Sequence, residues 1–579
     1  MKLPPVLAHS ILCIAASLFC LIPSALADGD FRTPSVVVKN GTINGRHLAE
    51  TWNQDLFLGI PYAQPPTGPL RFKWPQSLNK SYGTPLDAST YGYSCYQDSI
   101  TFNLSEDCLT LNGRACPFNS VTDNPLISFL VIRPDNVTES DSLPVLVWIY
   151  GGGLFSGSSA DPQYNLSGIV RASQEAQQPI IAVSINYRLG VWGFLQTPQL
   201  LEEGSSNAGL LDQRLALTWI KENIAAFGGD PGRVTVWGES AGAQSIALHL
   251  YSFGGRDDQL FHAAILESGS AIGVPLQPLA YYASPVDNLT RAVGCNDAAD
   301  QLACLRSVSS EALLSARGSN NWNPLVDGDF LTDYPSVLAD TGSFIKVPLL
   351  LGSNSDEGIS FGPTGLDDAA AIYYGLLSNP SFSGLPGLPY QISPASARRL
   401  LQLYPNDPSQ EPPYDIVNGT IFPQYGLQWR RSCAIYGDIV MIAGRRKLCA
   451  EYAAANQPVY SYRFATRPWD AAEADGVQHF VNVAFSFQNI TSVLGPLPEF
   501  QSHKDISDGI GRSYLNFVYW HDPNVRERGV QTRLPYWPKW TATNPSNMVL
   551  NATRAEVEKD QFRERGIAFL HTISRELLA

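Results

Sequence analysis

The sequence has no run of basic residues and no stretch in which basic and aromatic residues alternate. Its 39 Lys and Arg residues are outnumbered by 53 Asp and Glu residues, so the net charge is −14 at pH 7. Binding to nucleic acid relies on clustered positive charge, so nucleic acid is not an expected partner. The acidic balance favours solubility in an extracellular medium.

A second long apolar run, a low-complexity linker and an internal repeat are also missing. The one long apolar stretch, Val6–Ile22, follows Lys2 and ends at Pro23, too soon for a membrane anchor. Ala25-Leu26-Ala27 then offers small residues for cleavage. We therefore expect a secretory signal peptide over residues 1–27, no membrane anchor, and a secreted, extracellular chain. Residues 28–579 are expected to form one large domain with long insertions.

The cysteines do not have the spacing of zinc ligands, and no histidine lies near the close pairs. Two cysteines leave with the signal peptide, so seven remain and one thiol stays unpaired. Spacing predicts two small disulfide loops, Cys95–Cys108 and Cys295–Cys304. A third bridge, Cys433–Cys449, would leave Cys116 free.

Asn-x-Ser/Thr sequons are frequent in the chain after residue 27, which predicts a glycosylated surface. The nine positions are Asn40, Asn79, Asn103, Asn136, Asn165, Asn288, Asn418, Asn489 and Asn551.

Short β-rich runs alternate with helical patterns, which predicts an α/β fold with a large, mostly parallel, twisted sheet flanked by helices. The expected strands are Val145–Tyr150, Ile180–Ile185, Val234–Trp237, Ala263–Leu266, Val347–Leu351 and Val459–Phe464. The expected helices are Leu211–Ile224, Ala241–Leu250 and Phe562–Leu578, with a turn at Gly228–Gly232. In such sheets functional sites lie beyond the carboxyl ends of the strands.

Gly238-Glu239-Ser240-Ala241-Gly242 stands between an expected strand and an expected helix. This is the context of a nucleophile elbow, in which Ser240 adopts a strained conformation and glycines let strand and helix pack closely. The alternative is a helix N-cap serine in a glycine-rich turn. The strand-to-helix setting favours Ser240 as a nucleophile.

Gly151-Gly152-Gly153 follows the strand Val145–Tyr150, where bare N–H groups could bind a developing oxyanion. The N–H of Ala241 would be the third donor. A phosphate loop is rejected because no Lys-Ser/Thr follows, whereas a merely flexible turn stays open.

In this kind of fold the acid and then the histidine follow the nucleophile along the chain. His479, in a loop after the strand Val459–Phe464, is the preferred base, and His503 is second. Glu357 and Asp356 follow the strand Val347–Leu351 and are equally placed as the acid; Asp327 is a looser candidate. The other histidines after Ser240 lie in positions expected to be structural: His249, His262, His521 and His571.

The chain resembles the type-B carboxylesterase/lipase family of α/β-hydrolases, which includes cholinesterases and secreted fungal lipases. The resemblance rests on Phe57–Pro66, Ser105–Leu109 and Phe227–Pro231 together with the elbow around Ser240, and it runs nearly end to end.

The resemblance implies that Glu357, the Glu of Asp-Glu-Gly, completes a triad with Ser240 and His479. It implies Gly152, Gly153 and Ala241 as oxyanion donors and supports both close disulfides. Further matches are the ion pairs Arg71–Glu106 and Arg188–Asp212, and the positions of Glu239 and Ser268 near the triad.

Two departures from the family matter. Asn482 stands where many members have a Glu three residues after the histidine. The loop between Cys95 and Cys108 has only twelve residues and no Trp, so neither cholinesterase activity nor interfacial activation is expected. Trp322 and Phe330 either line the acyl pocket or pack in the core.

The expected function is therefore hydrolysis of small-molecule or lipid-like carboxylic esters through an acyl-enzyme, with no cofactor or metal. The alternatives are a triacylglycerol lipase, a catalytically inactive adhesion member of the family, or an esterase dedicated to one metabolite or plant polymer.

Overall fold

The computed structural model describes residues 32–49, 52–98, 102–111, 131–273, 275–318, 322–378, 390–417, 419–469, 471–488, 500–524 and 532–579. The predicted signal peptide, Cys116, Asn418 and Asn489 lie outside these residues.

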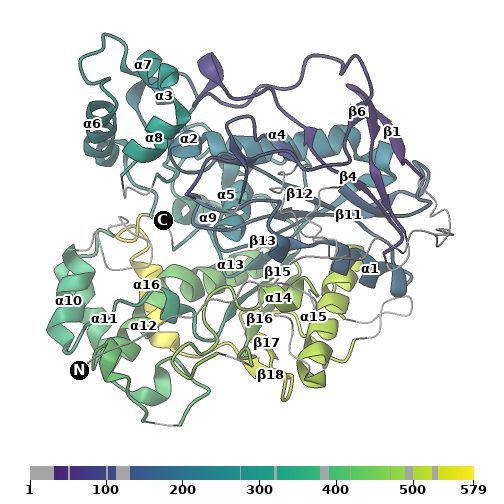
Figure 1. Ribbon diagram of the computed structural model, residues 1–579. Coiled ribbons are helices and arrows are strands. Elements are labelled where there is room, and N and C mark those ends of the chain that lie inside the picture. The colour runs from purple at the N-terminus through teal and green to yellow at the C-terminus, as the bar shows by residue number, and fades with distance from the viewer. Residues whose placement is uncertain are drawn as a thin grey trace, which may run out of the picture.

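One large sheet crosses the molecule (Figure 1). Within the described ranges it has eleven strands in the order β18-β17-β16-β15-β14-β13-β11-β12-β10-β4-β3. Neighbouring strands are parallel from β12 to β17, and antiparallel strands extend both edges. The strands are β3 (Arg46–Leu48), β4 (Gln54–Phe57), β10 (Val131–Pro134), β11 (Leu143–Ile149), β12 (Ile181–Ile185), β13 (Gly229–Glu239), β14 (Ala263–Glu267), β15 (Leu349–Asn354), β16 (Val459–Phe464), β17 (Ser546–Leu550) and β18 (Glu556–Lys559).

Smaller sheets are built from the N-terminal segment: β1 (Ser35–Val38), β2 (Gly41–Asn44) and β6 (Leu86–Asp87); β5 (Ile60–Pro61) and β9 (Thr110–Leu111); β7 (Ser94–Cys95) and β8 (Leu104–Ser105).

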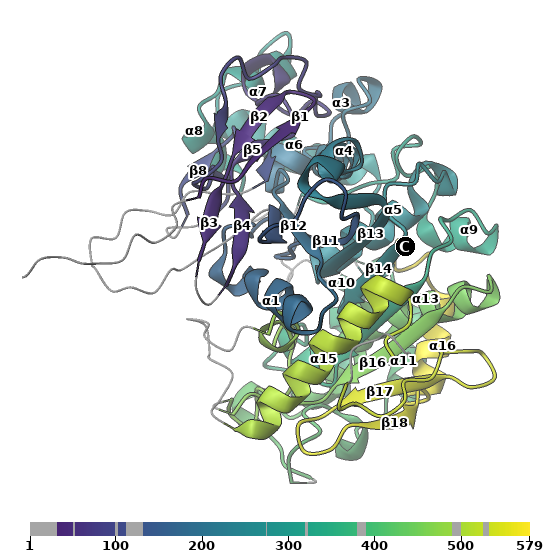
Figure 2. The same ribbon diagram turned by 90° about the vertical axis from the view of Figure 1, so that its right-hand side faces the viewer.

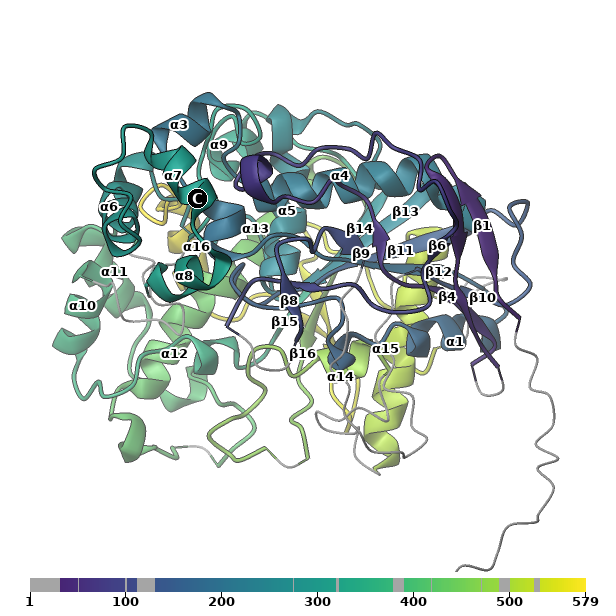
Figure 3. The same ribbon diagram turned by 45° about the horizontal axis from the view of Figure 1, so that its top comes forward.

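Helices cover both faces of the large sheet. Helices α1 (Ser167–Glu175) and α15 (Gln501–Trp520) cross one face, and α4 (Ala208–Asn223), α5 (Ala241–Gly255) and α13 (Ala443–Ala454) pack on the other (Figure 2). The short helices α6 (Ala283–Ala292), α7 (Gln301–Ser307) and α8 (Ser310–Ala316) gather at the top left of Figure 1, and α10 (Ala369–Ser378), α11 (Pro394–Leu403) and α12 (Trp429–Gly437) at its lower left. The others are α2 (Gly190–Phe194), α3 (Pro198–Glu202), α9 (Pro335–Asp340), α14 (Val483–Ser486) and α16 (Glu564–Thr572). Figure 3 shows α4 and α5 lying along the sheet, with β1 to their right at the edge of the molecule.

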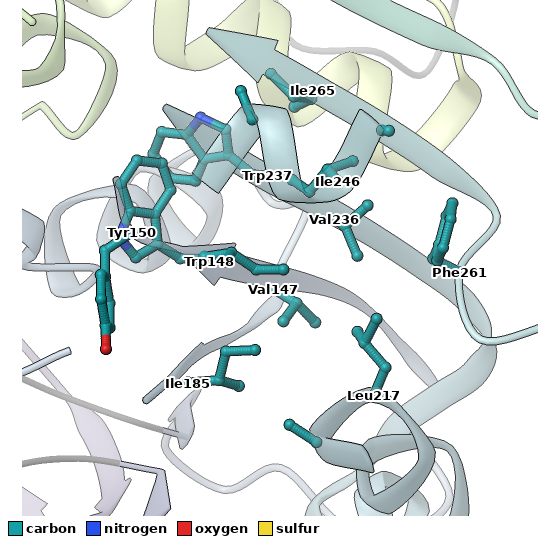
Figure 4. Packing of buried hydrophobic residues seen from close by; sticks show 14 of the residues in the cluster. Val147, Trp148, Tyr150, Ile185, Leu217, Val236, Trp237, Ile246, Phe261 and Ile265 are labelled. Carbon is teal, nitrogen blue, oxygen red and sulfur yellow. The ribbon is translucent and has the colours of Figure 1, made fainter. Parts of the chain in front are cut away.

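The central strands are buried on both faces, as their continuous apolar sequence predicts. Side chains alternate between the faces, so Val147 and Val236 meet Leu217 of α4, while Trp148 and Trp237 point to the other side (Figure 4). The rings of Trp148 and Trp237 lie 4.6 Å apart edge to face. This packing holds the strand ends, and hence the loops that follow them, in fixed positions.

The predicted strands and helices are confirmed, with two differences. The expected turn Gly228–Gly232 shortens to Gly228, because Gly229 already pairs with Leu143 before a register shift in β13. The expected terminal helix ends at Thr572, since the chain then turns to bury Leu578, whose carbonyl accepts a hydrogen bond from Leu276 N (2.8 Å).

The disulfides Cys95–Cys108 and Cys295–Cys304 are present, as predicted. The third expected bridge is wrong: Cys433 and Cys449 are both free and buried. Cys433 on α12 packs against the turn that follows β15, whereas Cys449 on α13 lies beside Ser461 of β16.

Candidate active site

Ser240 occupies the turn between β13 and α5 with φ 55° and ψ −124°, a strained backbone conformation for a residue with a side chain. Glycines surround it because strand and helix approach closely. A Cβ on Gly242 would lie 2.0 Å from the carbonyl oxygen of Ile149, and one on Gly238 would lie 2.7 Å from the backbone of Gly242. The turn has the geometry expected of a nucleophile elbow.

The structure brings the three predicted triad residues together. The Nε2 atom of His479 lies 2.8 Å from Ser240 Oγ, and its Nδ1 lies 2.7 Å from Glu357 Oε2. Glu357 begins the turn after β15, and its Oε1 accepts hydrogen bonds from Asn354 N (2.7 Å) and Ser268 Oγ (2.5 Å). The carboxylate is thus held on both oxygens, one of which faces the imidazole.

The rival candidates lie elsewhere. Asp356 points away from His479, and its oxygens accept hydrogen bonds from the backbone N–H groups of Val477 and Tyr414. Asp327 accepts from Leu331 and Asn207. His503 lies in α15 with Nε2 3.4 Å from Arg467 O, and His249, His262, His521 and His571 also lie outside the triad, in structural contacts.

A second carboxylate lies beside the imidazole. Glu239 is fully buried, with Oε1 3.3 Å from His479 Nε2. Burial raises the pKa of Glu239 to about 8, despite the nearby imidazole. Burial would lower the pKa of His479, but Glu239 and Glu357 more than offset this and raise it to about 9. When Glu239 holds a proton it no longer raises the pKa of His479, so neutral imidazole and protonated Glu239 can coexist near pH 7.

The glycine loop after β11 lies against the elbow. A Cβ on Gly151 would be 2.9 Å from Ser240 Cβ, so only glycine permits this approach. Gly152 (φ 91°) and Gly153 (φ 64°) have backbone conformations that favour glycine. In the described part of the chain their N–H groups have no hydrogen-bond acceptor, and Ala241 N is at the free N-terminus of α5.

One residue that sequence reasoning missed is Glu267, which ends β14 directly before Ser268. It is fully buried, and its carboxylate accepts hydrogen bonds from Tyr514 OH (2.5 Å), Asn482 Nδ2 (3.1 Å) and Ser486 Oγ (3.2 Å). Burial raises the pKa of Glu267 to about 7. The position of Glu267 at the end of a strand was a signal in the sequence. Its hydrogen-bond partners come from distant segments, so the sequence did not show that it belongs to the site.

The structure also places the expected ion pairs and the two candidate acyl-pocket aromatics. Arg71–Glu106 and Arg188–Asp212 are buried ion pairs. Trp322 and Phe330 are almost fully buried, and their aromatic contacts are with Tyr282 and with His249 and Phe253, as in core packing.

Most described sequons reach the surface, with Asn79, Asn136 and Asn288 exposed and Asn103, Asn165 and Asn551 half-buried. Asn40 does not fit: it is buried, and its Nδ2 donates to Leu78 O (3.2 Å) and Lys80 O (3.0 Å).

Among the described residues no cluster of His, Cys, Asp and Glu side chains suits a metal ion, and no described helix is long and apolar enough to span a bilayer.

The order of elbow, acid turn and histidine loop along a mostly parallel sheet is that of the α/β-hydrolase fold. A profile of the carboxylesterase family matches residues 32–569. The chain belongs to this family and is a carboxylic ester hydrolase.

Known fungal proteins are similar over most of their length. A secreted triacylglycerol lipase of Gibberella zeae is 32% identical, covering 93% of this chain and 90% of the relative. Lipase 1 of Geotrichum candidum is 33% identical, with 89% and 91% covered. The crystal structure of EstA from Aspergillus niger superposes with a TM-score of 0.79 at 26% identity, covering 94% of this chain and 99% of that one.

Proposed function

We propose that Ser240, His479 and Glu357 form the catalytic triad of this ester hydrolase. The observation that carries the proposal is the continuous line of short contacts from Glu357 Oε2 through the imidazole to Ser240 Oγ, at 2.7 and 2.8 Å. A nucleophile bonded to a base that a third group orients is the signature of nucleophilic acyl transfer.

The reaction proceeds in two transfers. His479 Nε2 takes the proton of Ser240 as its Oγ bonds to the ester carbonyl carbon, and Glu357 stabilises the imidazolium. The tetrahedral intermediate collapses, the C–O bond to the alcohol breaks, and His479 returns the proton to the leaving oxygen. Water then gives a proton to His479 as its oxygen bonds to the acyl carbon. The bond from that carbon to Ser240 Oγ breaks, and His479 returns the proton to Oγ, which releases the carboxylic acid and free Ser240.

Gly152, Gly153 and Ala241 are proposed to donate their N–H groups to the oxyanion. Two observations support this role: the N–H groups of Gly152 and Gly153 have no acceptor among the described residues, and their loop lies close to Ser240. Losing one such donor costs about 10²–10³ in kcat, and a Gly152→Ala protein, which must distort the loop, is expected to lose at least that much.

The direct test of the triad is a Ser240→Ala protein assayed on a p-nitrophenyl ester and with a fluorophosphonate probe. We expect loss of both turnover and labelling. Ser173→Ala, a buried serine of α1 remote from the site, is the matched control and should keep both. Wild-type turnover by Ser240→Ala would refute the triad, and failure of the wild-type protein to be labelled would favour an inactive adhesion protein.

Small-molecule or lipid-like esters are the proposed substrates, with triacylglycerols as the alternative that the names of the fungal relatives suggest. Contacts hold the described residues of the loop closed by Cys95–Cys108: Gln97 exchanges hydrogen bonds with the backbone of Gly157, and Tyr96 OH donates to Glu311. These contacts at the start of the loop oppose its use as a mobile lid. Activity that follows a simple saturation curve through the solubility limit of tributyrin supports an esterase, and a sharp rise above that limit supports a lipase.

Secretion is part of the proposal, supported by the N-terminal apolar segment, by the disulfides and by relatives named as secreted. Glycans are proposed at the sequons with accessible amides and not at Asn40. Expression in a yeast, N-terminal sequencing of the medium protein and glycopeptide mapping test both points.

A further inference from the structure

A cavity of about 240 Å³ lies outside the proposed active site. Its walls come from the end of β15, from β16, β17 and β18, from the first turn of α13 and the residue before it, from Tyr414, and from the segment before α16. Four arginines line it, Arg445, Arg446, Arg463 and Arg563, together with the carboxylates Glu558 and Asp560.

The cavity has a deep floor and an accessible rim. At the floor, the side chains of Arg445 and Asp560 are only 3% and 1% exposed. At the rim, Arg463 and Glu558 are about one-third exposed, at 33% and 30%. A small solute would therefore have to pass the Arg463–Glu558 pair to reach the buried guanidinium groups.

The acceptors at the floor do not satisfy all of the donors. Arg445 and Arg446 share one carboxylate, that of Asp560. The other two arginines each have a partner of their own, Glu558 for Arg463 and Asp438 for Arg563. Nη1 of Arg446 and Nε of Arg445 are buried without any acceptor among the described residues. Leaving buried charged donors without an acceptor is energetically unfavourable.

Asp356 is a fourth carboxylate in this region, but it does not fill the gap. It lies behind the wall, and its two oxygens accept hydrogen bonds from the backbone N–H groups of Tyr414 and Val477. A small anion with more than one oxygen is the acceptor that two neighbouring guanidinium groups favour beside Arg445 and Arg446.

Hydrogen bonds connect the wall of this cavity to the segments that carry Glu357 and His479. Arg463 Nη1 donates to Ser355 Oγ (2.7 Å), two residues before Glu357. Tyr414, which lines the cavity and contacts Arg563, holds Asp356 through its N–H, and Asp356 in turn holds Val477, two residues before His479.

We propose that this cavity is a binding site for a small oxyanion, a carboxylate or a phosphate, bound by Arg446 and Arg445, and that its occupation steadies the segments that carry Glu357 and His479. The site goes beyond ester hydrolysis itself. A bound carboxylate would be the acid product of ester hydrolysis, and a bound phosphate would come from the medium.

Binding is tested by thermal unfolding of the full chain in acetate, in phosphate and in chloride at equal ionic strength and pH. We expect a saturable rise of about 2 °C or more in the unfolding midpoint with acetate or phosphate over chloride. The anion that saturates at the lower concentration identifies the source. The Ser240→Ala protein should show the same rise, so this readout is independent of the proposed catalytic mechanism.

Two variants locate the effect. Arg446→Met removes one of the two unpaired donors. Ile442→Phe fills the cavity from its apolar wall without changing a charge, so it serves if Arg446→Met folds poorly. Both should lose the oxyanion-specific rise. Arg256→Met, which removes an exposed arginine paired with Asp258, should keep it. No rise in the wild-type protein, or an equal rise in all variants, overturns the binding site.

Coupling to the triad is tested by turnover of a p-nitrophenyl ester at saturating substrate. Acetate or phosphate is expected to change kcat at least twofold with the same concentration dependence as the thermal shift, and Ile442→Phe should abolish the change. A saturable thermal shift with an unaltered kcat overturns the coupling.

Discussion

Replacing Glu239 by glutamine removes a buried negative charge beside the proposed base while keeping the size of the side chain. The charge lies 3.3 Å from His479 Nε2. At an effective dielectric constant of about 20, two unit charges at that distance interact by about 5 kcal/mol, or between three and four pKa units.

The observable shift is smaller than this upper limit. Burial raises the pKa of Glu239 to about 8, so this residue is largely protonated when the imidazole is neutral. We expect Glu239→Gln to lower the pKa of His479 by about 1–2 units. Because the base must be neutral, the acid limb of the rate profile moves to lower pH, and activity at pH 5–6 rises relative to the plateau.

The assay is kcat/KM for a soluble p-nitrophenyl ester between pH 4.5 and 9, read at a wavelength where nitrophenol absorption is independent of pH. Glu451→Gln is the matched control, since Glu451 is a half-buried carboxylate whose pKa burial also raises and which accepts a hydrogen bond from Tyr251, but it lies outside the triad. An acid limb of Glu239→Gln that stays in place, or moves to higher pH, would refute the electrostatic account of Glu239.

Three other perturbations follow from buried groups. Asp560→Asn should destabilise the protein by about 3–5 kcal/mol in denaturant unfolding. Burial alone would raise the pKa of Asp560, but its two arginines hold it well below the usual value, so its contribution is present above about pH 4 and disappears as pH falls towards the folded pKa; a gap between wild type and variant that stays constant down to pH 2 would contradict this. Glu267→Gln should lower kcat about tenfold at unchanged KM, because the amide of Asn482 loses a charged acceptor; an unchanged kcat excludes this role. Cys433 and Cys449 are buried, and burial raises the pKa of both, so they should react with a thiol reagent only after unfolding; rapid labelling of the folded protein would contradict their burial.

The sheet and the residues at its strand ends could be predicted because their signals are local. A run such as Val459–Phe464 is a strand in the sequence and in the structure, with the same limits. Once strands are parallel and adjacent, the loops after them meet at one edge, so Ser240, Glu357 and His479 could be expected to converge. Choosing Glu357 over Asp356 needed the family resemblance, because adjacent acids at one strand end look alike until the direction of the turn is known.

Features that depend on distant packing could not be predicted. The Cys433–Cys449 pairing failed because spacing in sequence says nothing of the different surfaces on which α12 and α13 place the two thiols. The burial of Asn40 depends on its contacts with the backbone of residues 78 and 80, so the sequon alone could not indicate that this side chain is buried. The arginine-lined cavity joins β15 to the start of α16 across the sheet, and no short motif marks it.

The departure at Asn482 shows how such distant contacts compensate for a local change. The family resemblance leads us to expect a glutamate at this position, in the loop of the histidine. Here the carboxylate comes instead from Glu267 at the end of β14, and Asn482 Nδ2 donates to it (3.1 Å). The same amide accepts through Oδ1 from Asn354 (3.1 Å), whose backbone N–H holds Glu357. One neutral side chain therefore ties the loop of the base to the turn of the acid, and a carboxylate at position 482 could not do this, because it has no N–H to offer Glu267 and would stand beside another buried negative charge.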